Sequence, residues 1–151
     1  MNIKFCLLST LLIVPITANS FCFNEVGRKY NINPKLLAAI CYTESRFKPN
    51  AINDKNYNGS VDYGLCQINS FWLPHLKKFN ITKDDLINNP CINVEVSGWI
   101  LAQKLKQNGD NWTTIGAYNA GFSNSPKKVK AREIYISLVK QNLAYLNSLS
   151  N

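Results

Sequence analysis

The chain contains a single histidine, His75, among its 151 residues. A Ser-His-Asp hydrolase needs a histidine beside its nucleophile, and this one lies in a lysine-rich segment next to a proline, so we expect no such triad. The sequence has no Cys-x-x-Cys pair that could hold a zinc ion, and no Gly-Lys-Ser phosphate loop. We therefore expect neither a metal nor another cofactor.

Long apolar runs are absent beyond the first twenty residues. Residues 1–20 combine a positive charge at Lys4, an apolar stretch over residues 5–16, and small residues at Ala18 and Ser20. The apolar stretch is short for a membrane span, and the small residues occupy the two positions that a signal peptidase recognises before its cleavage site. We interpret residues 1–20 as a secretory signal peptide, with a membrane anchor as the alternative.

Acidic residues are scarce, with nine Asp and Glu against seventeen Lys and Arg. Residues 21–151 keep all nine acids and sixteen of the basic residues, a net charge of +7 in a chain long enough for one domain. A cationic exported protein suits an anionic partner. Because no nucleic-acid motif is present, we expect no nucleic acid partner. Phe21 is too bulky to precede a lipidated cysteine, so we expect no membrane insertion after cleavage.

Beyond the first twenty residues the chain has only four cysteines, Cys22, Cys41, Cys66 and Cys91. An even number of cysteines in an exported chain predicts two disulfides. Three pairings are open at this point. A zinc site is the alternative, and the lone histidine argues against it.

A helix is expected to begin at Asn33-Pro34, because asparagine caps helices and proline suits the first helical position. Glu44 lies in line with the apolar stripe of this helix, near its C-terminal end. The helix dipole and burial both disfavour its charge there, so we expect a raised pKa and a general acid. The alternative is a surface glutamate on a helix that ends one residue earlier. The stripe consists of Leu37, Ile40 and Cys41.

The remaining pattern is mostly helical. Thr82-x-x-Asp85 resembles a helix-start box, residues 91–105 form a helical seam, and residues 112–118 form a shorter helix. A polar loop over residues 47–60 leads into an extended segment, Val61 to Asn69, that Gly64 interrupts and that we expect to form a small β-element. A last amphipathic helix carries an apolar side made of Val129, Ile136, Val139, Leu143 and Leu146.

The start of that last helix is basic, and two interpretations are open. A solvated face is the preferred one. Positive charge at a helix start is locally unfavourable, which leaves room for an anion-binding role. The run consists of Lys127, Lys128, Lys130 and Arg132.

Other polar residues could serve a site. Asp62 is either a second catalytic carboxylate or a turn residue. Gln67 and Asn69 can share one face of an extended strand, which suits a ligand rich in hydroxyl and acetamido groups, and strand-edge polarity is the alternative. Tyr118 and Asn119 precede a glycine turn that a helix C-cap would also explain.

These motifs occur in a recognisable order: Glu44-Ser45, then Gly-Leu-x-Gln-Ile at 64–68, then Ala-Tyr-Asn-Ala-Gly at 117–121, then a tyrosine in the final helix. Over residues 22–145 the chain resembles the lytic transglycosylases of the lysozyme superfamily, especially the small exported enzymes that accompany secretion systems and pili. The resemblance implies a mainly α, α+β lysozyme-like fold. A helical body and a small lobe around residues 50–70 would form its cleft.

Residues 58–70, N-G-S-V-D-Y-G-L-C-Q-I-N-S, also resemble C-type lysozyme, where the aspartate before Tyr-Gly is the second catalytic carboxylate. The chain has half the cysteines expected of that family, and its Ala-Tyr-Asn-Ala-Gly belongs to the transglycosylase pattern. It departs from the transglycosylases at Cys66, where methionine is usual in Gly-Leu-Met-Gln.

The resemblance implies peptidoglycan as the substrate and Glu44 as the catalytic acid. The resemblance also implies that Asp62 is a cleft or structural residue. It implies that Tyr135 is the late tyrosine near the glutamate, with Tyr145 as a possible substitute. The other residues implied to line the cleft or support the sugar are Ser45, Gln67, Asn69, Tyr118 and Asn119.

The resemblance also suggests a Cys22–Cys91 disulfide, and we further expect Cys41 to pair with Cys66. It implies a monomer in the periplasm of a Gram-negative bacterium, or secreted, with peptidoglycan strands and components of a secretion or pilus machine as partners. Two other functions stay open: a lysozyme-like hydrolase that uses Glu44 and Asp62 as a pair, and a peptidoglycan-binding module without turnover.

Overall fold

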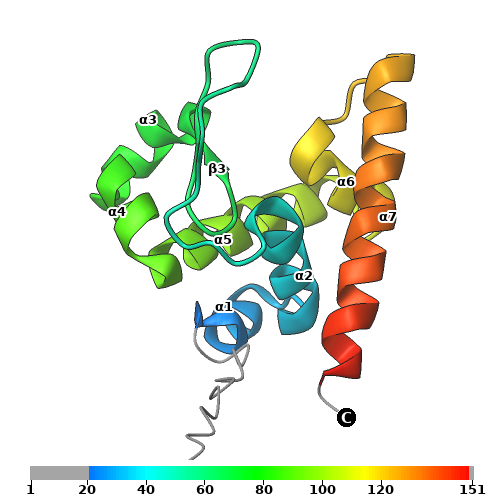
Figure 1. Ribbon diagram of the computed structural model, residues 1–151, viewed down its shortest axis with the longest axis horizontal. Helices are drawn as coiled ribbons and strands as arrows, with labels where there is room; N and C mark the ends of the chain where they lie inside the picture. The colour runs from blue at the N-terminus through cyan, green and yellow to red at the C-terminus, as the bar shows by residue number, and fades with distance from the viewer. Residues whose placement is uncertain (1–20, 150–151) are drawn as a thin grey trace, which may run out of the picture.

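The computed structural model describes residues 21–149, which form a helical body and a small sheet (Figure 1). The signal peptide expected at residues 1–20 lies outside the described residues. No helix in the described part is both long and apolar enough to cross a membrane. The elements are α1 (Phe23–Tyr30), α2 (Pro34–Ser45), β1 (Ile52–Asn53), β2 (Asp62–Tyr63), β3 (Ile68–Asn69), η2 (Ser70–Trp72), α3 (Leu73–Leu76), η3 (Lys77–Phe79), α4 (Lys83–Asn88), α5 (Pro90–Asn108), α6 (Trp112–Ala120) and α7 (Pro126–Ser148). The prediction of a mainly α fold with a small β-element is confirmed.

Helix α2 lies at the centre of the body, where it packs against α1, α5 and α7. The Asn33 side chain caps its start by accepting a hydrogen bond of 2.9 Å from the Lys35 backbone N–H. A continuous run of its residues is buried, and burial of this apolar surface is the main stabilising contribution of the helix. The run consists of Leu37, Ala38, Ala39, Ile40 and Cys41. Glu44 follows it in the last turn.

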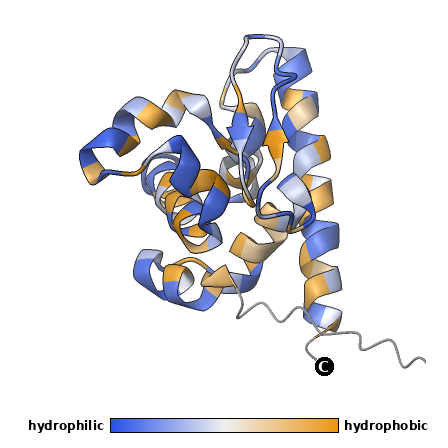
Figure 2. Cartoon of the chain, turned by 60° about the vertical axis from the view of Figure 1, so that its left-hand side comes forward, coloured by the Kyte–Doolittle hydropathy of each residue, from blue (hydrophilic) through white to orange (hydrophobic). Residues whose placement is uncertain are grey.

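Helix α7 packs against α2 and α6 along its whole inner side. Hydrophobic and hydrophilic residues alternate along it in Figure 2, as the sequence predicts for an amphipathic helix. Its buried residues include Tyr135 and Val139. Because α7 lies beside α2, residues near the C-terminus come within reach of Glu44.

Arg132 corrects the preferred interpretation of the basic run as a solvated face. Its side chain is buried on α7, at 7% exposure, whereas Lys127 and Lys130 are exposed. Nη1 of Arg132 donates hydrogen bonds to the carbonyls of Gly121, at 2.9 Å, and Ser123, at 2.7 Å. The guanidinium thereby caps the C-terminal end of α6, where positive charge is favourable.

The three strands form an antiparallel sheet in the order β1-β2-β3. Asp62 on the central strand pairs with Asn53 on one side and Asn69 on the other. The segment Val61 to Asn69 is therefore a hairpin rather than one interrupted extended run. Gln67 lies in the turn at φ 51°, so it does not share a strand face with Asn69.

Gly64 and Asn93 explain where the hairpin turns. Gly64 has φ 75°, and a Cβ there would overlap the Asn93 side chain and the Leu86 carbonyl. The buried Asn93 side chain accepts from the Cys66 N–H and donates to the carbonyls of Tyr63 and Leu86, each at 2.8 Å. The Asn93 side chain thus accepts one hydrogen bond and donates two, and two of the three backbone partners belong to the hairpin. Through this side chain, α5 holds the small sheet in place.

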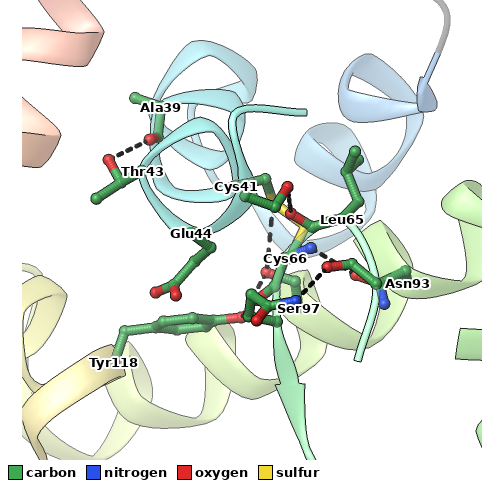
Figure 3. The surroundings of a disulfide bond; sticks show 12 residues. Ala39, Cys41, Thr43, Glu44, Leu65, Cys66, Asn93, Ser97 and Tyr118 are labelled. Carbon is green, nitrogen blue, oxygen red and sulfur yellow. Dashed lines mark hydrogen bonds between the residues drawn. A yellow bond between two sulfur atoms is a disulfide. The ribbon is translucent and has the colours of Figure 1, made fainter. Parts of the chain in front are cut away.

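Two disulfides join distant parts of the chain, Cys22–Cys91 and Cys41–Cys66. These are the pairs expected from the sequence. The first ties the start of α1 to α5. The second, shown in Figure 3, joins Cys41 on α2, three residues before Glu44, to Cys66 in the hairpin turn.

Candidate active site

Glu44 lines a pocket of about 340 Å³ between the helical body and the small sheet. This volume lies within the range of small-molecule sites in proteins. The other side chains around the pocket are mainly amides and hydroxyl groups, together with the carboxylate of Asp62. In Figure 3 the Glu44 carboxylate points toward the ring of Tyr118 and away from the disulfide.

The pKa of Glu44 is raised to about 7, and burial of the carboxyl group is the main cause. The negative charge of Asp62 raises this pKa further, and a hydrogen bond from Tyr135 lowers it. A carboxyl group with this pKa is a substantial fraction protonated at neutral pH. It can therefore donate a proton in one step and accept one in the next.

Tyr135 and Tyr118 come from two helices, and Tyr135 is hydrogen-bonded to the glutamate while the ring of Tyr118 lies on the side toward which its carboxylate points (Figure 3). The Tyr135 hydroxyl, from α7, donates a hydrogen bond of 2.6 Å to Oε1 of Glu44. The Tyr118 hydroxyl, from α6, lies 2.9 Å from Oγ of Ser97 and 3.3 Å from the Cys66 carbonyl. Burial raises the pKa of both phenols, so both stay protonated while Glu44 titrates.

Asp62 is held by three asparagine side chains on the sheet side of the pocket. Oδ2 accepts from Asn53 at 3.0 Å and from Asn56 at 2.8 Å, and Oδ1 accepts from Asn69 at 2.6 Å. The cross-strand register supplies two of these partners, because Asp62 stands between Asn53 and Asn69 in the sheet. Its orientation toward the pocket is therefore fixed by the fold.

The family model for the transglycosylase SLT domain matches residues 21–136. The chain belongs to this family. It is 41% identical to a peptidoglycan-binding-like protein of Escherichia coli O157:H7 (93% of this chain, 92% of the relative) and 41% identical to the invasion protein IagB of Salmonella typhimurium (89% and 82%). It is 39% identical to protein IpgF of Shigella flexneri, over 83% of this chain and 80% of the relative.

A solved structure has the same fold as this SLT domain. An inactive mutant of the lytic transglycosylase Slt from Pseudomonas aeruginosa matches with a TM-score of 0.58 and 21% sequence identity. The match covers 87% of this chain but only 22% of that much longer one. The prediction of a lysozyme-like fold is confirmed.

The structure brings most of the site residues expected from the sequence to one pocket of the SLT domain. Six of them line it: Glu44, Asp62, Gln67, Asn69, Tyr118 and Asn119. Tyr135 contacts Glu44 directly. Tyr145, its possible substitute, is 49% exposed and packs near Tyr42.

Ser45, expected in the cleft wall, is bonded to the hairpin instead. Its Oγ donates a hydrogen bond of 2.6 Å to the Leu65 carbonyl and accepts one from the Lys48 N–H. Gln67 likewise uses its side-chain amide N–H to hold the turn, at 2.9 Å from the Gly64 carbonyl. Both residues position the wall that faces Glu44.

Several pocket residues were missed by the sequence analysis. Asn56 and Ser60 come from the segment interpreted only as a polar loop, and Lys128 comes from the run interpreted as a solvated face. The signal that could have found the first two is the density of asparagine just before Asp62. Nothing in the local pattern separates Lys128 from its neighbours.

Proposed function

We propose that this SLT domain is a lytic transglycosylase that cleaves the β-1,4 bond between N-acetylmuramic acid and N-acetylglucosamine in peptidoglycan. The observation that carries the proposal is Glu44, a carboxyl group with a pKa of about 7 in a pocket lined mainly by amide and hydroxyl groups that suit a sugar. Amides such as Asn56, Gln67 and Asn69 can bind hydroxyl and acetamido groups of the glycan.

In the first step, protonated Glu44 donates its proton to the glycosidic oxygen, and the N-acetylglucosamine side leaves as an alcohol. Positive charge develops at the muramic anomeric carbon, where the muramic acetamido oxygen can stabilise it. The Tyr135 hydroxyl stabilises the carboxylate that Glu44 has become. This step therefore transfers one proton to the leaving group and consumes no water.

In the second step, ionised Glu44 accepts the proton of the muramic C6 hydroxyl, whose oxygen attacks the anomeric carbon of the same sugar. Because this attack is intramolecular, positioning supplies much of its advantage over attack by water. The product is a 1,6-anhydromuramic end, and Glu44 returns to its protonated form.

A second candidate function is hydrolysis with Glu44 and Asp62 as a pair. The observation in its favour is that the Asp62 carboxylate lines the same pocket and acts on the pKa of Glu44. In that case water attacks the anomeric carbon and leaves a reducing end. A binding module without turnover is a third reading, and one relative is named a peptidoglycan-binding-like protein.

We further propose that the enzyme is exported and opens the cell wall locally for a secretion or pilus apparatus. Two disulfides suit an oxidising compartment, and one relative is named an invasion protein. Cell fractionation of the full-length protein in its native host tests the location.

Mass spectrometry of the muropeptides released from purified peptidoglycan tests the reaction. Products lighter by one water than the reducing-end sugars support transglycosylation, and ordinary reducing ends support the hydrolase. Glu44→Gln is the matched control, since it keeps the shape of the side chain and removes the acid. Wall binding without any released product would favour the binding module.

A further inference from the structure

Lys128 is the cationic side chain that lines the active-site pocket in the described part of the chain. Lys128 lies in the first turn of α7, and Asn119, near the end of α6, lines the same pocket. The other two charged side chains around the pocket, Glu44 and Asp62, are both acids. The neighbouring Lys127 is exposed and is not part of the pocket wall.

The backbone at Lys128 is fixed by the surrounding loop. Its N–H bonds to the Ser125 carbonyl at 2.9 Å, and the Ser125 side chain caps the same turn. Arg132, one turn further on, holds the carbonyls of Gly121 and Ser123. The segment between α6 and α7 is therefore tied to α7, which sets Lys128 relative to the sugar-facing residues of α6.

Among residues 21–149, no carboxylate forms an ion pair with the Lys128 ammonium. In residues 21–149 the ion pairs are Lys29–Glu95 and Lys83–Asp84, both remote from the pocket lining. An ammonium group beside a polar pocket favours an anionic ligand, whereas ionised Glu44 and Asp62 repel one. The charge of Lys128 is thus available to a bound molecule.

We propose that Lys128 binds a carboxylate of the peptidoglycan strand and makes the site selective for acidic strands over neutral poly-N-acetylglucosamine. The proposal rests on the proposed function for its substrate class. Two sources supply such a carboxylate: the stem peptide, or the lactyl group of a muramic acid whose stem has been removed. A contact of this kind acts on binding, so Lys128 is a specificity residue and takes no part in proton transfer.

The test measures binding by isothermal titration calorimetry in a Glu44→Gln background, where no ligand is consumed. Three tetrasaccharides serve as probes: N-acetylglucosamine tetramer, a peptidoglycan fragment with intact stems, and the same fragment after an amidase has removed the stems. Lys128→Gln is compared with Lys127→Gln, a matched lysine in the same turn. Lys128→Arg keeps the charge and serves as the conservative variant.

We expect Lys128→Gln to weaken binding of a carboxylate-bearing fragment about tenfold, as for a partly exposed charge-assisted hydrogen bond. Binding of the neutral tetramer should stay within about twofold, as should all binding by Lys127→Gln and Lys128→Arg. A loss confined to the stem-bearing fragment identifies the stem carboxylate. A loss confined to the stem-free fragment identifies the lactyl carboxylate, because in the stem-bearing fragment that carboxyl group is bonded to the stem as an amide.

Unchanged binding of both anionic fragments by Lys128→Gln would overturn the proposal, and so would an equal loss for neutral and anionic ligands. Circular dichroism of each variant separates misfolding from lost recognition, and Lys128→Met, which also removes the charge, carries the test if Lys128→Gln fails to fold. Turnover plays no part in these measurements. Failure of the wild type to release anhydro ends would therefore count against the proposed reaction. It would not decide whether Lys128 binds a carboxylate, which the binding measurements test independently.

Discussion

The Tyr135 hydroxyl donates a hydrogen bond of 2.6 Å to Oε1 of Glu44 across 91 residues of sequence. This bond joins α7 to the last turn of α2 at the wall of the pocket. It favours the ionised form of Glu44, in opposition to burial and to the charge of Asp62. The working pKa of about 7 is the balance of these three influences.

Tyr135→Phe should move the pH dependence of activity upward. The alkaline limb of kcat/KM reports loss of the Glu44 proton at about pH 7, and removal of the hydrogen bond raises the pKa of Glu44. The reaction should also slow about tenfold, because the ionised glutamate loses a charge-assisted bond. A pH–rate profile on soluble glycan strands measures both effects. Tyr145→Phe is the control, and an equal shift in that variant would contradict the assignment of Tyr135.

Asp62→Asn should move the same limb in the opposite direction. The negative charge of Asp62 raises the pKa of Glu44, so its removal lowers that pKa and the alkaline limb shifts to lower pH. If Glu44 works alone, kcat should fall by about tenfold or less, whereas loss of a second catalytic carboxylate costs about a hundredfold or more. Asp54→Asn, an exposed aspartate on the same lobe, should change neither quantity. The anhydro content of the products, measured in parallel, decides between the two mechanisms.

Glu44→Gln should stabilise the fold at neutral and higher pH while it abolishes activity. The pKa of Glu44 is raised in the folded protein, so the native state holds this proton more tightly than the unfolded chain. Stability therefore falls as pH rises from about 4.5 to about 7, and the wild type should be about 3 kcal/mol less stable than the variant above that range. Urea unfolding at several pH values measures the difference. A stability gap that is the same at pH 4 and pH 8 would show that charge burial is not its cause.

The Cys41–Cys66 disulfide should contribute about 3 kcal/mol to stability, given its loop of 25 residues. Its loss in a Cys41→Ser, Cys66→Ser double variant should also loosen the hairpin that faces Glu44, so activity should fall with stability. The Cys22→Ser, Cys91→Ser variant is the matched control, since that bridge lies away from the pocket lining. It should lose stability and keep kcat for the fraction that remains folded. Equal effects of both variants on kcat would argue against a special role for the first bridge.

Asn93→Ala should destabilise the protein by about 3 kcal/mol. The substitution leaves the Cys66 N–H and the carbonyls of Tyr63 and Leu86 without their partner, in a site that excludes water. Thermal and urea unfolding measure the loss. Asn147→Ala, at an exposed position of α7, should stay within about 0.5 kcal/mol of the wild type. A loss under about 1 kcal/mol for Asn93→Ala would mean that α5 is not what holds the sheet.

Local signals were sufficient for the longer helices, whereas the short helices α1 and α3 were not predicted. The Asn33-Pro34 start and the Thr82-Asp85 box are both present as expected, because a cap depends on residues within one turn of each other. The hairpin was harder to predict. Its turn depends on Asn93 from a different helix, and a pattern of alternating residues carries no information about that contact.

The sequence by itself determined the longer helices and placed a glutamate at the end of an apolar stripe, since both follow from spacing along a few turns. Its even number of cysteines predicted two disulfides. Tertiary structure alone decided the neighbours of that glutamate. The packing of α7 on α2 placed Tyr135, and not Tyr145, in hydrogen-bond contact with Glu44. The sheet register placed Asp62 between two of its three asparagine partners. The packing of α6 on α7 buried Arg132 and left Lys128 at the pocket. These contacts join residues far apart in the chain, so they exist only once the core has brought the helices together.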